Sequence, residues 1–151
     1  MHHNFRPLAW RASALLAVFS TTSFAGQLWM EFGNPQVNSD LKARGAALVV
    51  RAVGCGDPAK AVFSGTAEGV VEGKRISAPL KFTALSQPGM YAVSAEGLKP
   101  GAWVAAITTT ESGRVASAVA PLDGSRAREA KVFPRRLESS DIDAALARHG
   151  D

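Results

Sequence analysis

The chain has 151 residues, of which 17 are Lys or Arg, 13 are Asp or Glu and 46% are hydrophobic. A formal net charge of +4 is too small for the electrostatic footprint of a nucleic-acid-binding protein. Because Cys55 is the only cysteine, no intramolecular disulfide can form, and stability has to come from packing.

The first 25 residues have the pattern of a secretory leader. Arg6 and Arg11 precede an apolar run over residues 12–19, and Ser23 and Ala25 place small residues at a cleavage point. We therefore predict a signal peptide cleaved after Ala25 and a secreted or periplasmic protein; an amphipathic or buried helix is the alternative. The apolar run is shorter than the roughly 20 residues of a transmembrane helix, and the 126 residues that remain suit one domain.

The mature chain is expected to begin with little regular structure. Residues 28–32 are apolar and fit an edge strand or a docked segment, whereas the stretch up to Gly45 is rich in turn-forming residues, with room for one helical turn. Residues 46–53 are almost continuously apolar, which is typical of a central strand. We divide the mature chain into an N-terminal segment and loop (26–45), a β-sandwich domain (46–133) and a C-terminal tail with a short helix (134–151).

The middle of the chain carries the strongest strand pattern. Apolar residues alternate with polar ones in three runs (80–84, 91–95 and 103–107), and a Pro-Gly pair lies in each connection between them. The pattern predicts an antiparallel meander in which Tyr91 and Trp103 are core aromatics. An aromatic platform for a carbohydrate or a cofactor is the alternative.

The rest of the pattern completes an all-β fold. Strands are expected over residues 60–63, 66–71, 114–120 and 128–133, with hairpin turns at 72–74 and 111–113. Ser140 followed by Asp143 predicts the start of a short C-terminal helix. We predict an antiparallel β-sandwich of about seven strands, immunoglobulin-like or transthyretin-like, with this short helix at its end.

Three segments carry recognisable turn and core motifs: the run GDPAKAV over residues 56–62, Gly89-x-Tyr91-x-Val93, and Leu98-x-Pro100-Gly101-x-Trp103-x-x-x-Ile107. Over residues 46–120 they resemble carboxypeptidase-regulatory-like, transthyretin-like domains. The resemblance implies an exported β-sandwich of about seven strands that acts as a binding, stabilising or interaction module without catalytic residues. Pro58 and Ala61 are closer than in that pattern and the stretch 66–86 is longer, which leaves another immunoglobulin-like sandwich open.

Candidate metal ligands are scattered along the chain. Met30, Cys55, Met90 and His149 carry groups that suit copper, but no short spacing joins them. Small exported domains linked to metal or copper handling also use a Pro-Gly-x-Tyr turn followed by Gly-x-Trp, as this chain does. We expect no metal and no cofactor; Cys55 and Met90 are the candidates if the protein is a periplasmic copper- or metal-handling accessory.

Residues for catalysis are also scarce. His149 is the only histidine after the leader, so a Ser-His-Asp arrangement is not expected. Asp57, Glu68 and Glu72 would have to meet in space to act as paired carboxylates. The chain is therefore predicted not to be an enzyme, with a small exported hydrolase as an alternative.

Five cations lie close together near the C-terminal end: Arg126, Arg128, Lys131, Arg135 and Arg136. They are expected as solvated surface or as a patch for an anionic envelope component, such as a phospholipid head group or a polyanionic glycan. We predict a non-enzymatic binding or interaction module whose partner is an unidentified protein or envelope component and not nucleic acid. Residues 28–32 would offer an edge strand for pairing with that partner.

Overall fold

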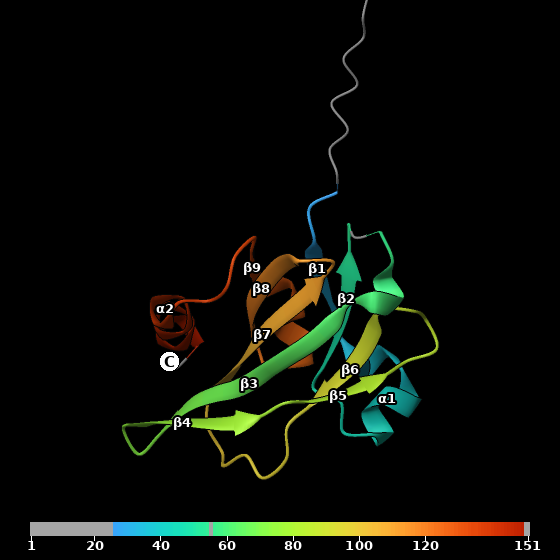
Figure 1. Cartoon of the computed structure of the whole chain (residues 1–151). Helices are drawn as coiled ribbons and strands as arrows, with labels where there is room; N and C mark the ends of the chain where they lie inside the picture. The colour runs from blue at the N-terminus through green and yellow to red at the C-terminus, as the bar shows by residue number, and fades with distance from the viewer. Residues whose placement is uncertain (1–25, 55, 150–151) are drawn as a thin grey trace, which may run out of the picture.

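Two antiparallel sheets face each other in the computed structural model, which describes residues 26–54 and 56–149 (Figure 1). Sheet A has the order β1 (Trp29–Gly33), β2 (Leu48–Val53), β6 (Met90–Ser94), β5 (Lys81–Ala84). Sheet B has the order β4 (Lys74–Pro79), β3 (Val62–Val71), β7 (Trp103–Glu111), β8 (Arg114–Pro121), β9 (Lys131–Phe133). The predicted all-β antiparallel sandwich is confirmed, with nine strands in the described part of the chain where about seven were expected.

The helical elements are short and lie at the margins of the sandwich. They are the 3-10 turns η1 (Pro35–Val37), η2 (Pro58–Lys60) and η3 (Gly124–Glu129), and the α-helices α1 (Ser39–Ala43) and α2 (Ser139–His149). The predicted C-terminal helix is α2, which lies beside β7 and β8 (Figure 1). Within the two described ranges, no helix combines the length and apolar character needed to cross a bilayer.

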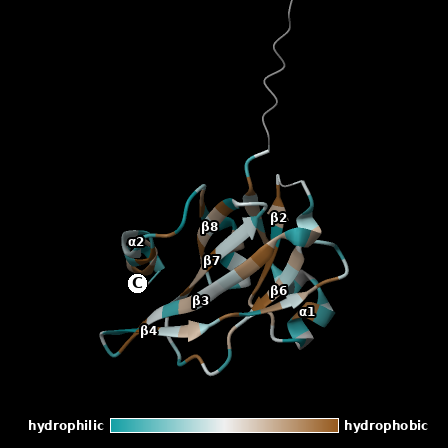
Figure 2. Ribbon diagram, in the orientation of Figure 1, coloured by the Kyte–Doolittle hydropathy of each residue, from teal (hydrophilic) through white to brown (hydrophobic). Residues whose placement is uncertain are grey.

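The main core lies between the sheets and joins large side chains with small ones. Leu48, Val50 and Val93 of sheet A are fully buried, and they face a surface of sheet B that is rich in alanine. The alanines that sheet B contributes to this core are Ala67, Ala105, Ala116, Ala118 and Ala120. Figure 2 shows the hydrophobic residues of β2 and β3 in brown, whereas α1 is largely hydrophilic. Alternating large and small residues lets the two layers interdigitate without voids.

The predicted three-stranded meander is wrong in its last strand. β5 and β6 form the expected hairpin, in which Gly89 has a φ of +72°. β7, however, pairs with β3 and β8 in sheet B. Because Ile107 faces the main core and Val104 is buried beneath α2, this strand needs a central place with both faces covered. A Pro-Gly pair specifies a bend, and the residues between β6 and β7 then cross from one sheet to the other.

Most other local signals agree with the structure, but the strand predicted over residues 128–133 is wrong in its first half, because η3 extends to Glu129 and β9 begins only at Lys131. β2 lies inside sheet A and β1 lies at its edge. The predicted hairpin turns join β3 to β4 and β7 to β8, with positive φ angles at Glu72, Gly73, Ser112 and Gly113. β3 is one continuous strand, although the first part of the predicted run 60–63 is taken by η2.

A second, smaller apolar cluster holds α2 against the outer face of sheet B. It consists of Val104 of β7, Val119 of β8, and Ala145 and Leu146 of α2, all buried. Phe133, Leu137 and Ile142 pack around it. The cluster fixes the C-terminal end of α2 next to η3, where the candidate site lies.

Candidate binding site

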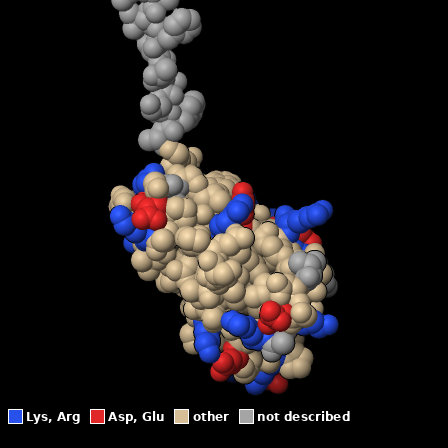
Figure 3. Space-filling model, turned by 90° about the vertical axis from the view of Figure 1, so that its right-hand side faces the viewer, with Lys and Arg blue, Asp and Glu red and all other residues tan. Residues whose placement is uncertain are grey.

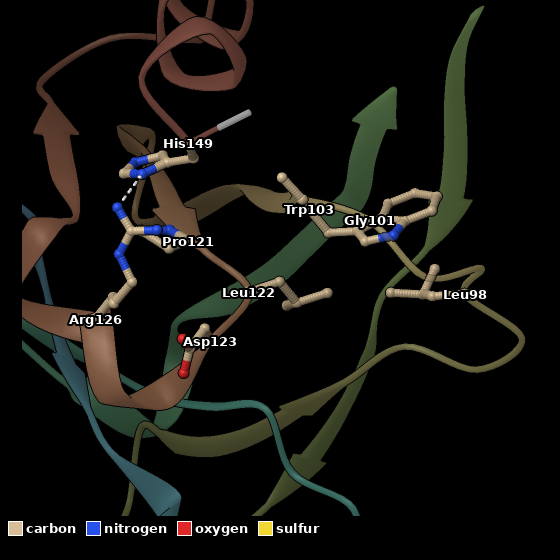
Figure 4. Close-up of a pocket in the computed structure, with 9 residues that line it drawn as sticks. Leu98, Gly101, Trp103, Pro121, Leu122, Asp123, Arg126 and His149 are labelled. Carbon is tan, nitrogen blue, oxygen red and sulfur yellow. Dashed lines mark hydrogen bonds between the residues drawn. The ribbon is translucent and has the colours of Figure 1, made fainter. Parts of the chain in front are cut away.

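A hollow of about 350 Å³ lies where the end of α2 meets the sandwich (Figure 4). Its main side chains come from β7, η3, α2 and the two loops β6–β7 and β8–η3: Leu98, Trp103, Leu122, Asp123, Arg126 and His149. The volume is at the lower end of the range of small-molecule pockets, about 300 to 1,000 Å³. The hollow is therefore large enough for a small ligand.

One end of the hollow is apolar and is built on Trp103. A Cβ atom added at Gly69 would lie only 2.7 Å from the Trp103 ring, so glycine at this position lets the indole lie against β3. The indole Nε1 donates to the carbonyl oxygen of Lys99 at 2.8 Å. Leu98 and Leu122 complete this end (Figure 4). The ring is thus fixed in place, and its hydrogen-bonding group is already used.

The other end is polar and is centred on Arg126. Its guanidinium donates to Glu129 through Nε at 2.9 Å and through Nη2 at 3.0 Å. Nη2 is also 2.8 Å from Nδ1 of His149, a contact drawn as a dashed line in Figure 4. Because an arginine can only donate, Nδ1 must accept, which leaves the imidazole neutral with its proton on Nε2.

Asp123 adds a carboxylate to this polar end. It is the N-cap of η3, where its Oδ1 accepts hydrogen bonds from the backbone N–H and the hydroxyl of Ser125 at 3.0 and 2.8 Å. Within the part of the chain that the structure describes, neither Oδ2 of Asp123 nor Nη1 of Arg126 has a hydrogen-bond partner. The hollow therefore offers both an acceptor and a donor of full charge.

The electrostatics of His149 favour its neutral form. Its side chain is only 7% exposed. Burial lowers the pKa of this imidazole, and the neighbouring Arg126 lowers it further, against a smaller opposite effect of Glu129. A proton added to His149 would meet the positive charge of Arg126, so acid weakens the contact that closes this end of the hollow.

Ion pairs hold the other end of α2. Asp141 accepts from Nη1 and Nη2 of Arg135 at 2.7 and 3.0 Å, and also from the backbone N–H of Glu138. These hydrogen bonds lower the pKa of Asp141 to about 2. Nη1 of Arg75, on the edge strand β4, reaches Asp143 of α2 at 2.6 Å. The first turns of the helix are thus tied both to the strand-to-helix loop and to sheet B.

The carboxylate of Glu68 links this network to the outer face of sheet B. Burial raises the pKa of Glu68, but hydrogen bonds from Thr66, Ser77 and Arg75 outweigh that effect, and the pKa lies below its usual value. The side chain is only 9% exposed. Its charge is therefore compensated where β3 and β4 meet, close to α2.

The structure distributes the five predicted cations over different surroundings. Arg126 lines the hollow, and Arg135 binds Asp141. The Arg135 guanidinium and the Lys131 ammonium lie 4.8 and 5.2 Å from the ring centre of Phe133. Arg128 and Arg136 are exposed and form no ion pair with any described residue. Whether this surface binds an anionic partner stays a prediction.

The candidate metal ligands lie apart from one another. Met30 is buried in the main core, and Met90 lines a separate hollow between α1 and the β5–β6 hairpin. Cys55 lies outside the described residues, and His149 is in the hollow at α2. In residues 26–54 and 56–149 no group of three or more His, Cys, Asp and Glu side chains is arranged to hold a metal ion.

The potential acid–base residues have structural partners. Glu68 is bound by Arg75, Asp57 caps η2, and Glu72 occupies the turn between β3 and β4. Nδ1 of His149 lies 2.8 Å from Nη2 of Arg126 and 3.6 Å from Oε2 of Glu129. His149 is held in place at the end of α2, because Ala145 and Leu146 pack against sheet B and bury this end of the helix.

Sequence reasoning missed the hollow itself. Local signals existed for its polar parts, since Asp123 precedes Ser125 in a capping pattern, and Arg126 and Glu129 have helical spacing. Nothing in the sequence joins His149 to Arg126, which are 23 residues apart.

On the face turned away from α2, basic and acidic side chains are mixed, and no patch of one charge stands out in this view (Figure 3). The hollow is therefore the feature of the described structure that best combines shape and chemistry.

Comparison with known proteins found no relative. No family model matches the chain, and neither a curated protein nor a solved structure does.

Proposed function

We propose that the protein is an exported, non-enzymatic binding module that takes up a small ligand in the hollow between η3, β7 and the end of α2. The resemblance to transthyretin-like domains and the leader pattern of residues 1–25 support export and a binding role. The sandwich acts as the scaffold, and the hollow is the binding site.

The observation that carries this proposal is the division of the hollow into an apolar and a polar end. Trp103 and Leu122 offer apolar surface, while Asp123 and Arg126 offer charged groups with hydrogen-bonding capacity. Pockets with mostly apolar walls and a few placed polar groups are typical ligand sites. His149 binds Arg126 and leaves this polar end without an activated nucleophile.

Binding is tested by NMR on protein recovered from cells that express the full chain with its leader. After cleavage behind Ala25 two tryptophans remain, Trp29 and Trp103. Small amphipathic probes at millimolar concentration should shift the indole N–H signal of Trp103. The signal of Trp29 should stay in place, because Trp29 lies at the other end of the sandwich. There Arg114, the first residue of β8, donates to the Gly26 carbonyl, whereas Pro121 at the far end of β8 lines the hollow.

Export is tested on the same sample by mass spectrometry. A protein that begins at Gly26 supports export, whereas a chain that retains residues 1–25 in the cytoplasm contradicts it. Probes that shift neither indole signal, or both equally, contradict the use of the hollow.

A further inference from the structure

The charged side chains that line the polar end of the hollow have both signs, since Arg126 is positive and Asp123 is negative; Glu129 binds Nε and Nη2 of Arg126 but does not line the hollow. A ligand with a single negative charge would approach Arg126 but would also meet the carboxylate of Asp123. A ligand with a single positive charge would be attracted by Asp123 but repelled by Arg126. A head group that carries both charges would pair each of them with an opposite charge.

The apolar end restricts the rest of the ligand. Leu98, Pro121 and Leu122 present no side-chain hydrogen-bonding atoms, and the indole N–H of Trp103 is already bound to Lys99. A polyol placed there would lose its hydrogen bonds to water without replacing them, which is costly. An aliphatic or aromatic side chain loses nothing there and gains burial.

We infer that the hollow binds a free α-amino acid with an apolar side chain. Its carboxylate pairs with Nη1 of Arg126, its ammonium with Oδ2 of Asp123, and its side chain lies between Leu122 and Trp103. This inference rests on the proposed function and specifies the ligand class of the same hollow. His149 and Glu129 engage Nη2 and Nε of Arg126, so Nη1 is the donor left for the ligand's carboxylate.

The ligand class is tested with three probes that differ only in their charged groups. Leucine carries both charges, isocaproate lacks the ammonium and isoamylamine lacks the carboxylate. Titration is followed by the indole N–H signals of Trp103 and Trp29. Leucine should bind at least about tenfold more tightly than either analogue, because each analogue loses one charge-assisted hydrogen bond.

A pair of matched variants tests the role of Asp123. Asp123→Asn keeps a side chain that caps η3 but removes its charge, and Asp57→Asn makes the same change at the cap of η2, outside the hollow. Asp123→Asn should weaken leucine binding about tenfold, because the ammonium loses its partner, and should strengthen isocaproate binding, because the carboxylate that repels this anion is gone. Asp57→Asn should leave both unchanged.

The outcomes separate the two proposals. If the three probes bind equally well, or if Asp123→Asn binds leucine as the parent does, the amino-acid assignment is overturned while the hollow remains a binding site. A dipeptide that binds more tightly than leucine also overturns it, in favour of a peptide end. If no probe shifts the Trp103 signal, the proposed function itself is contradicted.

Discussion

The two apolar interfaces of this protein are built differently. Between the sheets, the fully buried Leu48, Val50 and Ile107 share one cluster with alanines, so apolar contacts hold this interface. Beneath α2, the buried cluster has only four residues, and three polar contacts around it hold the helix in place. Apolar burial is insensitive to pH, whereas charged contacts respond to it. The sandwich should therefore be robust, and α2 with its hollow should respond to conditions.

The largest effect is expected from truncation in the main core. Leu48→Ala removes a fully buried side chain and should lower the free energy of unfolding by about 2 to 5 kcal/mol. Urea unfolding followed by circular dichroism measures this change. Val70→Ala is the control, because Val70 is 48% exposed and its truncation should change stability by no more than about 0.5 kcal/mol. Equal effects of both variants would contradict the assigned core.

A glycine on β3 tests the link between the sandwich and the hollow. A Cβ at Gly69 would lie 2.7 Å from the Trp103 ring, so Gly69→Ala should cost about 1 to 3 kcal/mol and displace the indole. The Trp103 indole N–H signal should move in the NMR spectrum. Gly33→Ala is the matched control on an edge strand, where the new Cβ would lie at an ordinary 3.7 Å from Val49. A Trp103 signal unchanged by Gly69→Ala would show that the ring does not lie on β3.

The C-terminal end of α2 should weaken in mild acid. Since folding lowers the pKa of His149, the unfolded chain binds a proton more readily, and this group lowers the free energy of unfolding as pH falls below about 6.5. Urea unfolding at pH 7.5 and 5.5 measures the change. His149→Gln keeps an acceptor for Arg126 but does not titrate, so part of the pH dependence should disappear. A variant with the same pH dependence as the parent would exclude His149 as its source.

The first turns of α2 should keep their stabilising ion pair down to a lower pH than the C-terminal end of the helix. Acid should therefore change their stability little between neutral pH and about pH 4. The pKa of Asp141 is lowered to about 2, so its contribution to stability is complete above the ordinary value of 3.8 and is lost as pH falls toward 2. Arg135→Gln should therefore destabilise the helix at pH 5 but make little difference at pH 2. Amide signals of α2 followed by NMR report this. The same loss at both pH values would argue against the Arg135–Asp141 pair.

Local signals in the sequence predicted the elements better than their partners. Alternation and turn residues indicated β2, the β5–β6 hairpin and α2, because these signals act over a few residues. The placement of β7 depends on the main core covering one face of the strand and α2 covering the other. A local pattern of residues does not show which distant elements will cover a strand. The hollow depended on α2 bringing His149 to Arg126, a contact that capping and spacing rules do not describe. The cluster of basic residues was visible in sequence, but its ion pairs with Asp141 and Glu129 were not predicted.

Hydrogen exchange tests the contrast between the two interfaces most directly. Amide exchange is measured by mass spectrometry at pH 7.5 and 5.5 and corrected for the intrinsic effect of pH on exchange. We expect amides at the C-terminal end of α2 (residues 145–149) to lose protection at pH 5.5, because His149 takes up a proton there, while amides of β7 and β8 keep theirs. Equal loss of protection at this end of α2 and in the central strands, or no loss at this end, would contradict this expectation.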